Sequence, residues 1–330
     1  NPYQIATLAN LKWLSMTPSV WNAKFLQTAD INASDTRNWD DGKGFKPIGF
    51  DYDNSFYGVY DGSHHLITDL FINRPGQYVG LFGYIRGGQG QVVSKVNLRN
   101  IHLTGSDTGS IVGQAFGGLV VEYCSSVDAN LTGTDVGGLV GNVNMGGGTI
   151  KLSSFDGYIN GSGNIGGIAG SLGDTAIDSC YAITQFFNGG TNKGGLAGSI
   201  FYGAAFFDGV SQNFSISSLP LYGSYEFLDS DEEPVKLTSF WDSNISNTNP
   251  VLESWAVGKT TQEMKTKSTF ANAGWDFNDT WFMPESGYPI LRWQVTNFPP
   301  KELNSIADLT ITENQPIGTI AGEFNATDPE

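Results

Sequence analysis

The chain has 330 residues, of which 39% are hydrophobic and 13% aromatic, so it has enough apolar side chains to bury a large core. Its formal net charge of −16 disfavours binding to phosphate backbones and anionic lipid, which makes nucleic acid and membrane surfaces poor partners. No run of about 18 apolar residues occurs, so we expect no membrane-spanning helix. Glycine is abundant, with 43 residues, and this favours a turn-rich β protein.

The N-terminal 20 residues are predicted to form a short helix that covers one end of the fold. Pro2 is suited to the start of such a helix. The apolar side chains expected on one helical face are Ile5, Leu8, Leu11 and Leu14. The next segment, NAKFLQTADINAS, has the pattern of a strand pair.

A glycine phrase recurs at a regular interval through the middle of the chain. It reads VGLFG, TGSIVG, VGGLVG, IGGIAG and KGGLAG, with 28 to 30 residues between successive copies. The last glycines of the five copies are Gly83, Gly113, Gly141, Gly170 and Gly198. Four copies carry an Asp or Asn six residues earlier, at Asp107, Asp135, Asn164 and Asn192. The copies therefore form an internal repeat.

Short β-type runs lie between the glycine phrases, bounded by Gly, Asn and Asp. A helical solenoid would contain less glycine, and a propeller blade generally needs about 40 residues. The repeat therefore predicts an all-β chain, a right-handed parallel β-helix of about seven to nine coils with short capping helices. In this interpretation the adjacent glycines take corner conformations with positive φ, and the apolar pair beside them points into the lumen.

The two cysteines, Cys124 and Cys180, fall at nearly equivalent places two repeats apart, with Ser153 between them. Two coil spacings are about 10 Å, which is too far for a disulfide bond. We therefore expect two free, mostly buried thiols.

Asp107 and Asp135 occupy the same column in successive coils, so we expect their carboxylates about 5 Å apart. That spacing fits a retaining glycosidase pair or a calcium site. The structural alternative is that Asx side chains bond to backbone N–H groups at the corner, and the uncharged Asn164 and Asn192 in the same column favour it.

His64 and His65, in the segment DGSHHLI, are expected to turn one ring inward and the other outward. No Cys or further His stands at ligand spacing, which disfavours zinc, and no HExxH motif of a zinc peptidase occurs. The letters GSGNIG at 161–166 match a dinucleotide fingerprint, but another glycine phrase and a strand follow where a helix is required. A β-helix corner is the favoured interpretation.

The region 201–227 is rich in aromatic residues, and the repeat loses its regularity there. Aromatic rings on the side of a solenoid can form a ligand surface, and core packing in an irregular coil is the alternative. The candidate ligand-binding residues are Phe201, Tyr202, Phe206, Phe207, Tyr222 and Tyr225.

The end of the repeat region is predicted to cover the last coil. Thr260 stands three residues before Glu263, which is the capping box of a short helix. The following residues, WDFNDTWFMPESGYPILRW, bring four Trp and Tyr side chains that would cover apolar edge surface.

These motifs together resemble the GLUG-repeat family. The resemblance rests on the GGLVG phrase, the opening YQIATLANLKWLS, the segment FYGVYDGSHHLITDL and the ending from GKTTQEMKTKSTFANAG to YPILRW. It covers about residues 1–295 and implies a β-helical module of a large secreted or surface-anchored bacterial protein. Such modules occur in adhesin-like proteins and in the noncatalytic part of some IgA-specific metallopeptidases. The family is defined by its scaffold, so the resemblance does not fix a function.

Residues 296–330 are similar to a linker and the first strands of a cadherin-like domain, with the phrase ENQPIGTIAGEFNATDPE. The resemblance implies Ca²⁺ as a cofactor, with Glu313, Asp328 and Glu330 as ligands. About a third of such a domain is present, so this calcium site is incomplete.

We predict a noncatalytic extracellular module of a bacterial surface adhesin, a monomeric segment of a longer chain that acts as a scaffold and binds carbohydrate or a cell surface. The alternatives are a polysaccharide lyase or glycoside hydrolase on a β-helix scaffold, and a purely structural spacer. An enzyme on this scaffold needs carboxylates with Lys or Arg nearby, but residues 100–200 contain only Lys151 and Lys193.

Overall fold

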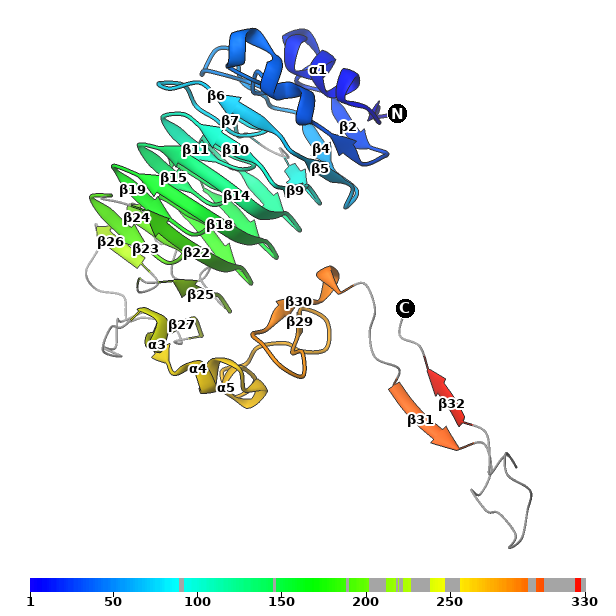
Figure 1. The fold of residues 1–330 in the computed structure, drawn as a ribbon, viewed down its shortest axis with the longest axis vertical. Coiled ribbons are helices and arrows are strands. Elements are labelled where there is room, and N and C mark those ends of the chain that lie inside the picture. The colour runs from blue at the N-terminus through cyan, green and yellow to red at the C-terminus, as the bar shows by residue number, and fades with distance from the viewer. Residues whose placement is uncertain are drawn as a thin grey trace, which may run out of the picture.

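The computed structural model describes residues 1–88, 92–144, 147–187, 190–201, 212–217, 219, 222–226, 238–246, 256–295, 301–305 and 324–327. Residues 1–295 contain a parallel β-solenoid of about five turns with a few short helices, as Figure 1 shows. The predicted parallel β-helix with capping helices is confirmed. The expected seven to nine coils were too many, because complete four-sided coils are confined to the glycine repeat in the described part of the chain.

Four lateral sheets run along the solenoid, and we name them A to D. Sheet A consists of β1 (Tyr3–Ile5), β2 (Lys24–Gln27), β4 (Val59–Asp61), β8 (Val92–Ser94), β13 (Val120–Glu122), β17 (Gly148–Lys151) and β21 (Thr175–Asp178). Sheet B consists of β3 (Ile31–Asn32), β5 (Leu66–Thr68), β9 (Asn97–Arg99), β14 (Ser125–Gly133), β18 (Ser154–Gly161), β22 (Tyr181–Phe187), β25 (Phe214–Ser217), β27 (Phe240–Asp242) and β28 (Val257–Lys259). Two further strands extend it, β10 (His102–Thr104), which pairs with β14, and β6 (Phe71–Asn73), which pairs with β10.

The other two sheets carry the glycine phrases. Sheet C consists of β7 (Phe82–Arg86), β12 (Val112–Phe116), β16 (Val140–Asn144), β20 (Ala169–Gly173), β24 (Ala197–Phe201) and β26 (Tyr222–Glu226). Sheet D consists of β11 (Asp107–Gly109), β15 (Asp135–Gly137), β19 (Asn164–Gly166) and β23 (Asn192–Gly194). The fingerprint-like GSGNIG therefore leads into strand β19 and then β20, as the corner interpretation predicts.

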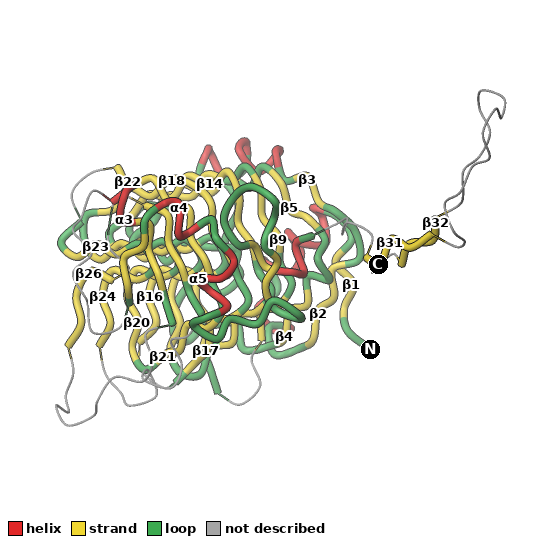
Figure 2. Tube along the Cα trace, turned by 90° about the horizontal axis from the view of Figure 1, so that it is seen from below, coloured by secondary structure: helices red, strands yellow, loops and turns green. Residues whose placement is uncertain are grey.

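The strand register follows the sequence repeat. Asp107 pairs with Asp135, and Val136 pairs with Ile165 on the next coil. Every pairing between neighbouring coils in sheets A to D is parallel, so equivalent residues stack along the axis, as Figure 2 shows. This stacking turns each sequence column into a row of side chains on one face.

The lumen is filled by the apolar pair of each repeat. Leu139 and Val140 are fully buried, as are Ile168 and Ala169 one coil later. The prediction that this pair points inward is confirmed. Because each coil buries its apolar side chains against its neighbours, the coils form one continuous core.

The glycines of the repeat serve a different purpose from the one predicted. Gly109, Gly137 and Gly166 do not have positive φ values. A Cβ atom on Gly137 would lie 1.9 Å from the carbonyl oxygen of Val140, and one on Gly166 would lie 2.1 Å from that of Ala169. These glycines are required because the backbone folds tightly back on itself at the corner between sheets D and C.

At the corner between sheets A and B, the left-handed conformation occurs at residues that are not glycine. One such residue precedes the sheet B strand of each successive coil, with φ between 50° and 59°. The stacked corner residues are His64, Lys95, Tyr123, Leu152, Ser179 and Gln212. A left-handed residue at each corner lets the chain turn sharply from sheet A into sheet B.

Both cysteines follow this corner, and both are free and fully buried, as predicted. Burial raises the pKa of the Cys124 thiol to about 12 and also raises that of Cys180. Ser153 lies between them in the stack and accepts a hydrogen bond at 3.0 Å from the backbone N–H of Cys124. The thiols act as small apolar core groups.

Helices and turns close the N-terminal end. Helix α1 (Leu8–Met16) buries Leu11 and Leu14, and Thr7 caps it by accepting a hydrogen bond from the backbone of Asn10 at 3.2 Å. Ile5 is buried in strand β1 rather than in the helix, because residues 3–5 pair with β2. Three short 3-10 helices follow, η1 (Pro18–Val20), η2 (Ser34–Asn38) and η3 (Asp40–Gly42).

A C-terminal segment covers the other end of sheet B. It contains α3 (Ser243–Ser246), α4 (Thr261–Met264), α5 (Lys267–Ala271), a short hairpin of β29 (Trp281–Phe282) and β30 (Ile290–Leu291), and η4 (Arg292–Gln294). The predicted capping box is present at α4, where Thr260 and Glu263 bond to each other's backbone N–H groups at 2.8 and 3.2 Å.

The aromatic side chains of this segment cover apolar edge surface, as predicted. Trp281 is fully buried and packs with Phe214 of sheet B at a ring distance of 5.9 Å. A separate antiparallel pair, β31 (Lys301–Ser305) with β32 (Phe324–Thr327), lies in the region predicted to begin a cadherin-like domain. The division of the chain near residue 295 stays a prediction.

Candidate ligand-binding groove

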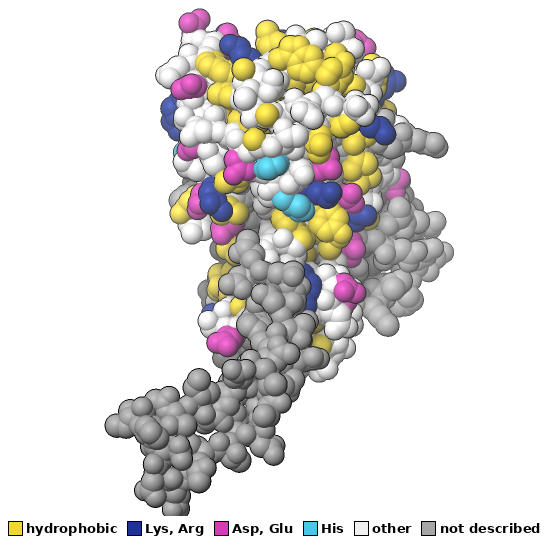
Figure 3. All heavy atoms as spheres, turned by 90° about the vertical axis from the view of Figure 1, so that its right-hand side faces the viewer, with side chains coloured by type: hydrophobic (Ala, Val, Ile, Leu, Met, Phe, Trp, Pro, Cys, Tyr) yellow, Lys and Arg dark blue, Asp and Glu magenta, His cyan; other side chains and the backbone are white. Residues whose placement is uncertain are grey.

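A groove of about 470 Å³ lies between the outer face of sheet B and the end of the C-terminal segment. Strands β9 and β14 form its floor, and Trp293 and Gln294 of η4 form one wall. We call it the Trp293 groove. Figure 3 views the side of the molecule where histidine side chains lie beside hydrophobic, basic and acidic ones.

Strand alternation builds the floor. In β9, Leu98 points into the core with 1% of its surface exposed, so Asn97 and Arg99 on either side of it point outward. One coil later, Ser125 and Val127 of β14 pair with these two residues. The floor therefore offers an amide, a guanidinium, a hydroxyl and an apolar side chain.

Hydrogen bonds hold the wall in place. The indole N–H of Trp293 donates to the carbonyl oxygen of Leu152 at 2.9 Å. The side chain of Gln294 donates to the hydroxyl of Ser154 at 2.7 Å and accepts from the hydroxyl of Tyr181 at 2.8 Å. These three bonds join the C-terminal segment to two successive coils, since Leu152 and Ser154 belong to one coil and Tyr181 to the next.

The ring of Trp293 lies 5.0 Å from the imidazole of His64, which closes one end of the groove. His64 has a φ of 59°, and its carbonyl oxygen accepts a hydrogen bond from Asn97 at 2.8 Å. Burial in this contact, followed by the nearby Lys95, lowers the pKa of His64. The imidazole is therefore neutral at pH 7.

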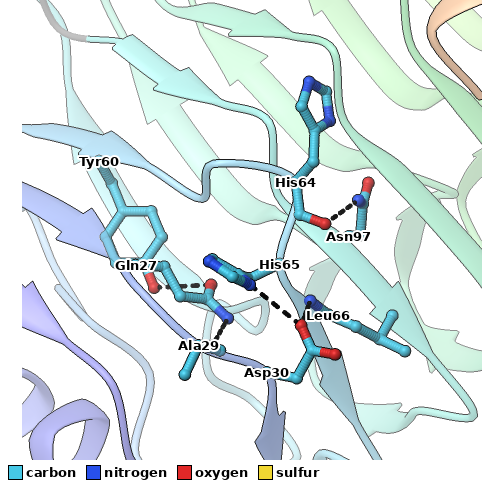
Figure 4. A network of polar contacts seen from close by, with 8 residues as sticks. All are labelled: Gln27, Ala29, Asp30, Tyr60, His64, His65, Leu66 and Asn97. Atoms are coloured by element: carbon cyan, nitrogen blue, oxygen red, sulfur yellow. Dashed lines mark hydrogen bonds and ion pairs between the residues drawn. The ribbon is translucent and has the colours of Figure 1, made fainter. Parts of the chain in front are cut away.

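The expectation that one histidine ring faces inward was wrong. Figure 4 shows His64 and His65 pointing to different sides of the chain, with His65 directed at Asp30 and an Nδ1 to Oδ1 distance of 3.2 Å. Neither ring enters the core, because the left-handed conformation of His64 breaks the strand alternation before β5. Among the described residues, no group of three or more His, Cys, Asp or Glu side chains is placed to hold a metal ion.

Asp107 and Asp135 are not part of the Trp293 groove lining, and they stand next to each other in sheet D. Burial, and then the charge of Asp135, raises the pKa of Asp107 to about 6. Asp135 accepts hydrogen bonds from the backbone and side-chain nitrogens of Asn164 at 2.7 and 3.3 Å. Asn192 donates in turn to Asn164 at 2.7 Å.

This row therefore acts as a ladder in which Asx side chains bond to the next coil. The predicted Asx capping is present, but its backbone partner stands one coil away instead of within the same turn. Both oxygens of Asp135 are already used in the ladder, which leaves this carboxylate poorly suited to a nucleophile's role.

Most of the predicted site residues cannot be placed against this groove. Phe201 ends β24 and is partly buried, and β26 contains Tyr222 and Tyr225, of which the structure describes only the backbone. The other predicted site residues lie outside the described part of the chain: Tyr202, Phe206, Phe207, Glu313, Asp328 and Glu330. Calcium binding by the last three stays a prediction.

Sequence reasoning missed the Trp293 groove. Trp293 was expected only to cover an edge, and His64 was considered only as a metal ligand. Nothing in the local sequence pairs the two, because they meet only through the path of the C-terminal segment. In the part of the chain that the structure describes, no helix has the length and apolar character needed to cross a bilayer.

No protein-family profile matches the chain. Over 125 residues the chain is 39% identical to halomucin of Haloquadratum walsbyi, a match that covers 36% of this chain and 1% of halomucin. Over 119 residues it is 34% identical to a protein of Evansella cellulosilytica named as a Gly-rich membrane protein, covering 36% of this chain and 13% of that protein. The matched part is thus a small fraction of both relatives.

Two solved structures share the fold. One is the structure of a protein from Bacteroides ovatus that is named as an immunoglobulin A1 protease. It superimposes with a TM-score of 0.50 and 18% identity over 89% of this chain and 93% of that chain. A second IgA1 protease superimposes with a TM-score of 0.52 and 20% identity over 73% of this chain and 19% of that chain. At these identities the similarity establishes the β-solenoid alone.

Proposed function

We propose that this chain is a noncatalytic module of a large extracellular surface protein of the GLUG-repeat type, and that it binds carbohydrate in the Trp293 groove. The observation that carries the proposal is a groove of about 470 Å³ that combines an aromatic wall with polar floor groups. This volume is in the range of small-ligand sites.

The chemistry of the groove suits a sugar. An indole ring can pack against the C–H face of a pyranose, while the groups beside it bond to hydroxyls. Asn97 and Ser125 are already bonded to each other at 2.9 Å, so they form a fixed polar floor, and Arg99 is exposed above it. A fixed floor and wall reduce the ordering cost of binding.

A binding role is better supported than catalysis. Among the described residues that line the groove there is no Asp or Glu, and burial favours the uncharged forms of its two groups with shifted pKa values, because it lowers the pKa of His64 and raises that of Tyr181. Glycoside hydrolysis generally requires two carboxyl groups across the scissile bond. The halomucin and Gly-rich membrane protein names of the two relatives support a location at the cell surface.

The test is a glycan array probed with the purified chain, with and without Ca²⁺, alongside assays for depolymerisation of acidic polysaccharides. We expect binding without turnover. Trp293→Ala should weaken binding about tenfold, whereas Trp293→Phe, which keeps a ring, should retain most of it. Trp13→Ala is the matched control, because Trp13 is 40% exposed and lies outside the groove.

Three outcomes would contradict the proposal. Turnover of a polysaccharide would establish an enzyme, and absence of binding to every glycan would leave a structural spacer. Equal losses in Trp293→Ala and Trp13→Ala would place the ligand elsewhere.

A further inference from the structure

A second surface, on the N-terminal half of the solenoid, brings basic groups and aromatic rings together. Two hollows of about 430 and 460 Å³ lie next to each other there and share Lys46 and Arg74 in their linings. Trp39 and Lys12 line the first, and Phe50 lines the second. Three basic side chains thus line the two hollows, against the two carboxylates of Asp40 and Asp51, in a chain with a net charge of −16.

Arg74 is built into this surface. Only 9% of it is exposed, and it donates to the carbonyl oxygens of Phe45 and Gly44 at 3.1 Å each. Its Nη2 also lies 2.8 Å from a carboxylate oxygen of Asp40, and this hydrogen bond lowers the pKa of Asp40. The guanidinium is therefore held in one orientation between the two hollows, and its charge is partly balanced.

The lysines are held over ring faces. The amino group of Lys12 lies 4.4 Å from the ring centre of Trp39, and that of Lys46 lies 4.7 Å from the ring centre of Phe50. A cation over a ring keeps its outward side free for an anion. These positions fix two positive charges beside two aromatic walls.

The pattern continues along the solenoid axis onto sheet C. Tyr78 lines the second hollow, and its ring lies 5.5 Å from that of Tyr84. Tyr52 follows at 6.4 Å from Tyr84, and Phe116 lies 5.7 Å from Tyr52. The guanidinium of Arg86 lies over the ring of Tyr52 at 4.3 Å.

Rings with cations beside them thus extend from the N-terminal cap to β12, the second strand of sheet C. We name this surface the basic aromatic strip, and it comprises Lys12, Trp39, Lys46, Phe50, Arg74 and Tyr78, with Tyr52, Arg86 and Phe116 beyond them. Among its rings, Tyr52 and Phe116 are the most exposed, at 44% and 36%.

We propose that the basic aromatic strip binds an anionic polysaccharide, one that carries carboxylate or sulfate groups on successive sugars. Such a chain presents sugar faces and negative charges in alternation, which the rings and cations of the strip complement. The strip is extended along the axis, as a polymer requires. It is separate from the Trp293 groove, so this inference does not rest on ligand binding there.

The experiment measures binding of the purified chain to polygalacturonate, alginate and chondroitin sulfate, with neutral dextran as the uncharged comparison. We expect binding to at least one anionic polymer and none to dextran. Lys46→Ala should weaken it about tenfold, because Lys46 borders both hollows, and Lys46→Arg should restore most of it. Tyr52→Ala, at an exposed position, should also weaken it severalfold.

Matched controls separate a defined site from diffuse attraction. Lys24→Ala removes an exposed lysine of β2, and Tyr158→Ala removes a ring on sheet B that is 40% exposed. Both should bind like the parent chain. Failure to bind all three anionic polymers would overturn the proposal, as would equal losses in Lys46→Ala and Lys24→Ala. Loss in Trp293→Ala with no loss in Lys46→Ala would assign the binding to the other groove.

Discussion

At the scale of single residues, substitution of a repeat glycine tests whether the tight corner leaves room for a Cβ atom. Gly137→Ala should destabilise the fold by about 3 kcal/mol, since its Cβ would meet the carbonyl oxygen of Val140 at 1.9 Å. Gly76→Ala is the control for backbone conformation, because Gly76 has a φ of +79° and open space around it, and it should cost about 1 kcal/mol. Urea unfolding measures both losses, and a loss for Gly137→Ala no larger than that for Gly76→Ala would contradict the close-packing explanation.

Also at the residue scale, Asp107 should make stability depend on pH. Its pKa rises from 3.8 to about 6 on folding, so the folded chain holds the proton more tightly than the unfolded chain does. Stability is therefore lost as the pH rises from about 4 to 6, by at most about 3 kcal/mol.

Asp107→Asn removes this loss while keeping a side-chain oxygen that can accept from Ser106 and Asn142. Its stability relative to the parent chain should increase between pH 4 and pH 7, which urea midpoints at the two pH values would measure. Asp35→Asn, at an exposed position, is the control and should show no such trend. A constant difference between Asp107→Asn and the parent chain would contradict the prediction.

At the scale of elements, the C-terminal segment protects the last strands of sheet B. Trp281→Ala should cost about 4 kcal/mol, because the ring is fully buried among Tyr181, Phe214 and Trp275. It should also cause self-association, seen by light scattering, since an uncovered sheet edge pairs with other chains. Trp13→Ala, at a 40% exposed position, should change stability by less than about 1 kcal/mol. Similar losses in both variants would argue against the capping role.

The elements also show how far the sequence predicted the structure. Residues that repeat at a fixed interval report the environment of equivalent positions, so Leu139 and Ile168 could be placed in the lumen and Cys124 and Cys180 apart from each other. The backbone conformation at the corners was harder to predict. A glycine can be required either because φ is positive or because neighbouring backbone leaves no room for a Cβ atom, and the sequence is the same in both cases.

The candidate sites could not be predicted in the same way. Trp293 meets His64 only because the C-terminal segment runs back along sheet B, and no repeat relates the two residues. The basic aromatic strip likewise joins the N-terminal cap to sheet C, through Lys46 and Tyr78 in different parts of the chain. A site formed where a cap or terminal segment meets the repeat brings together residues that do not recur at a fixed interval, so the sequence repeat does not reveal it.

At the scale of the whole molecule, the net charge of −16 sets how the solenoid responds to salt. Like charges repel more strongly in the compact state than in the unfolded chain, so screening should stabilise the fold. We expect the melting temperature to rise when NaCl increases from about 10 mM, where charges interact over about 30 Å, to about 1 M, where they interact over about 3 Å.

A variant with fewer charges separates screening from general salt effects. Asp35→Asn, Asp279→Asn and Glu285→Gln, all at exposed positions, should together raise the melting temperature in low salt and reduce its dependence on NaCl. The same salt should weaken binding of anionic polysaccharide to the basic aromatic strip, because that attraction is electrostatic. Salt would thus stabilise the scaffold while it releases the ligand, and the two effects can be measured on one sample by thermal unfolding with and without alginate. A melting temperature that is unchanged by NaCl in the parent chain would show that its acidic groups are too far apart to repel.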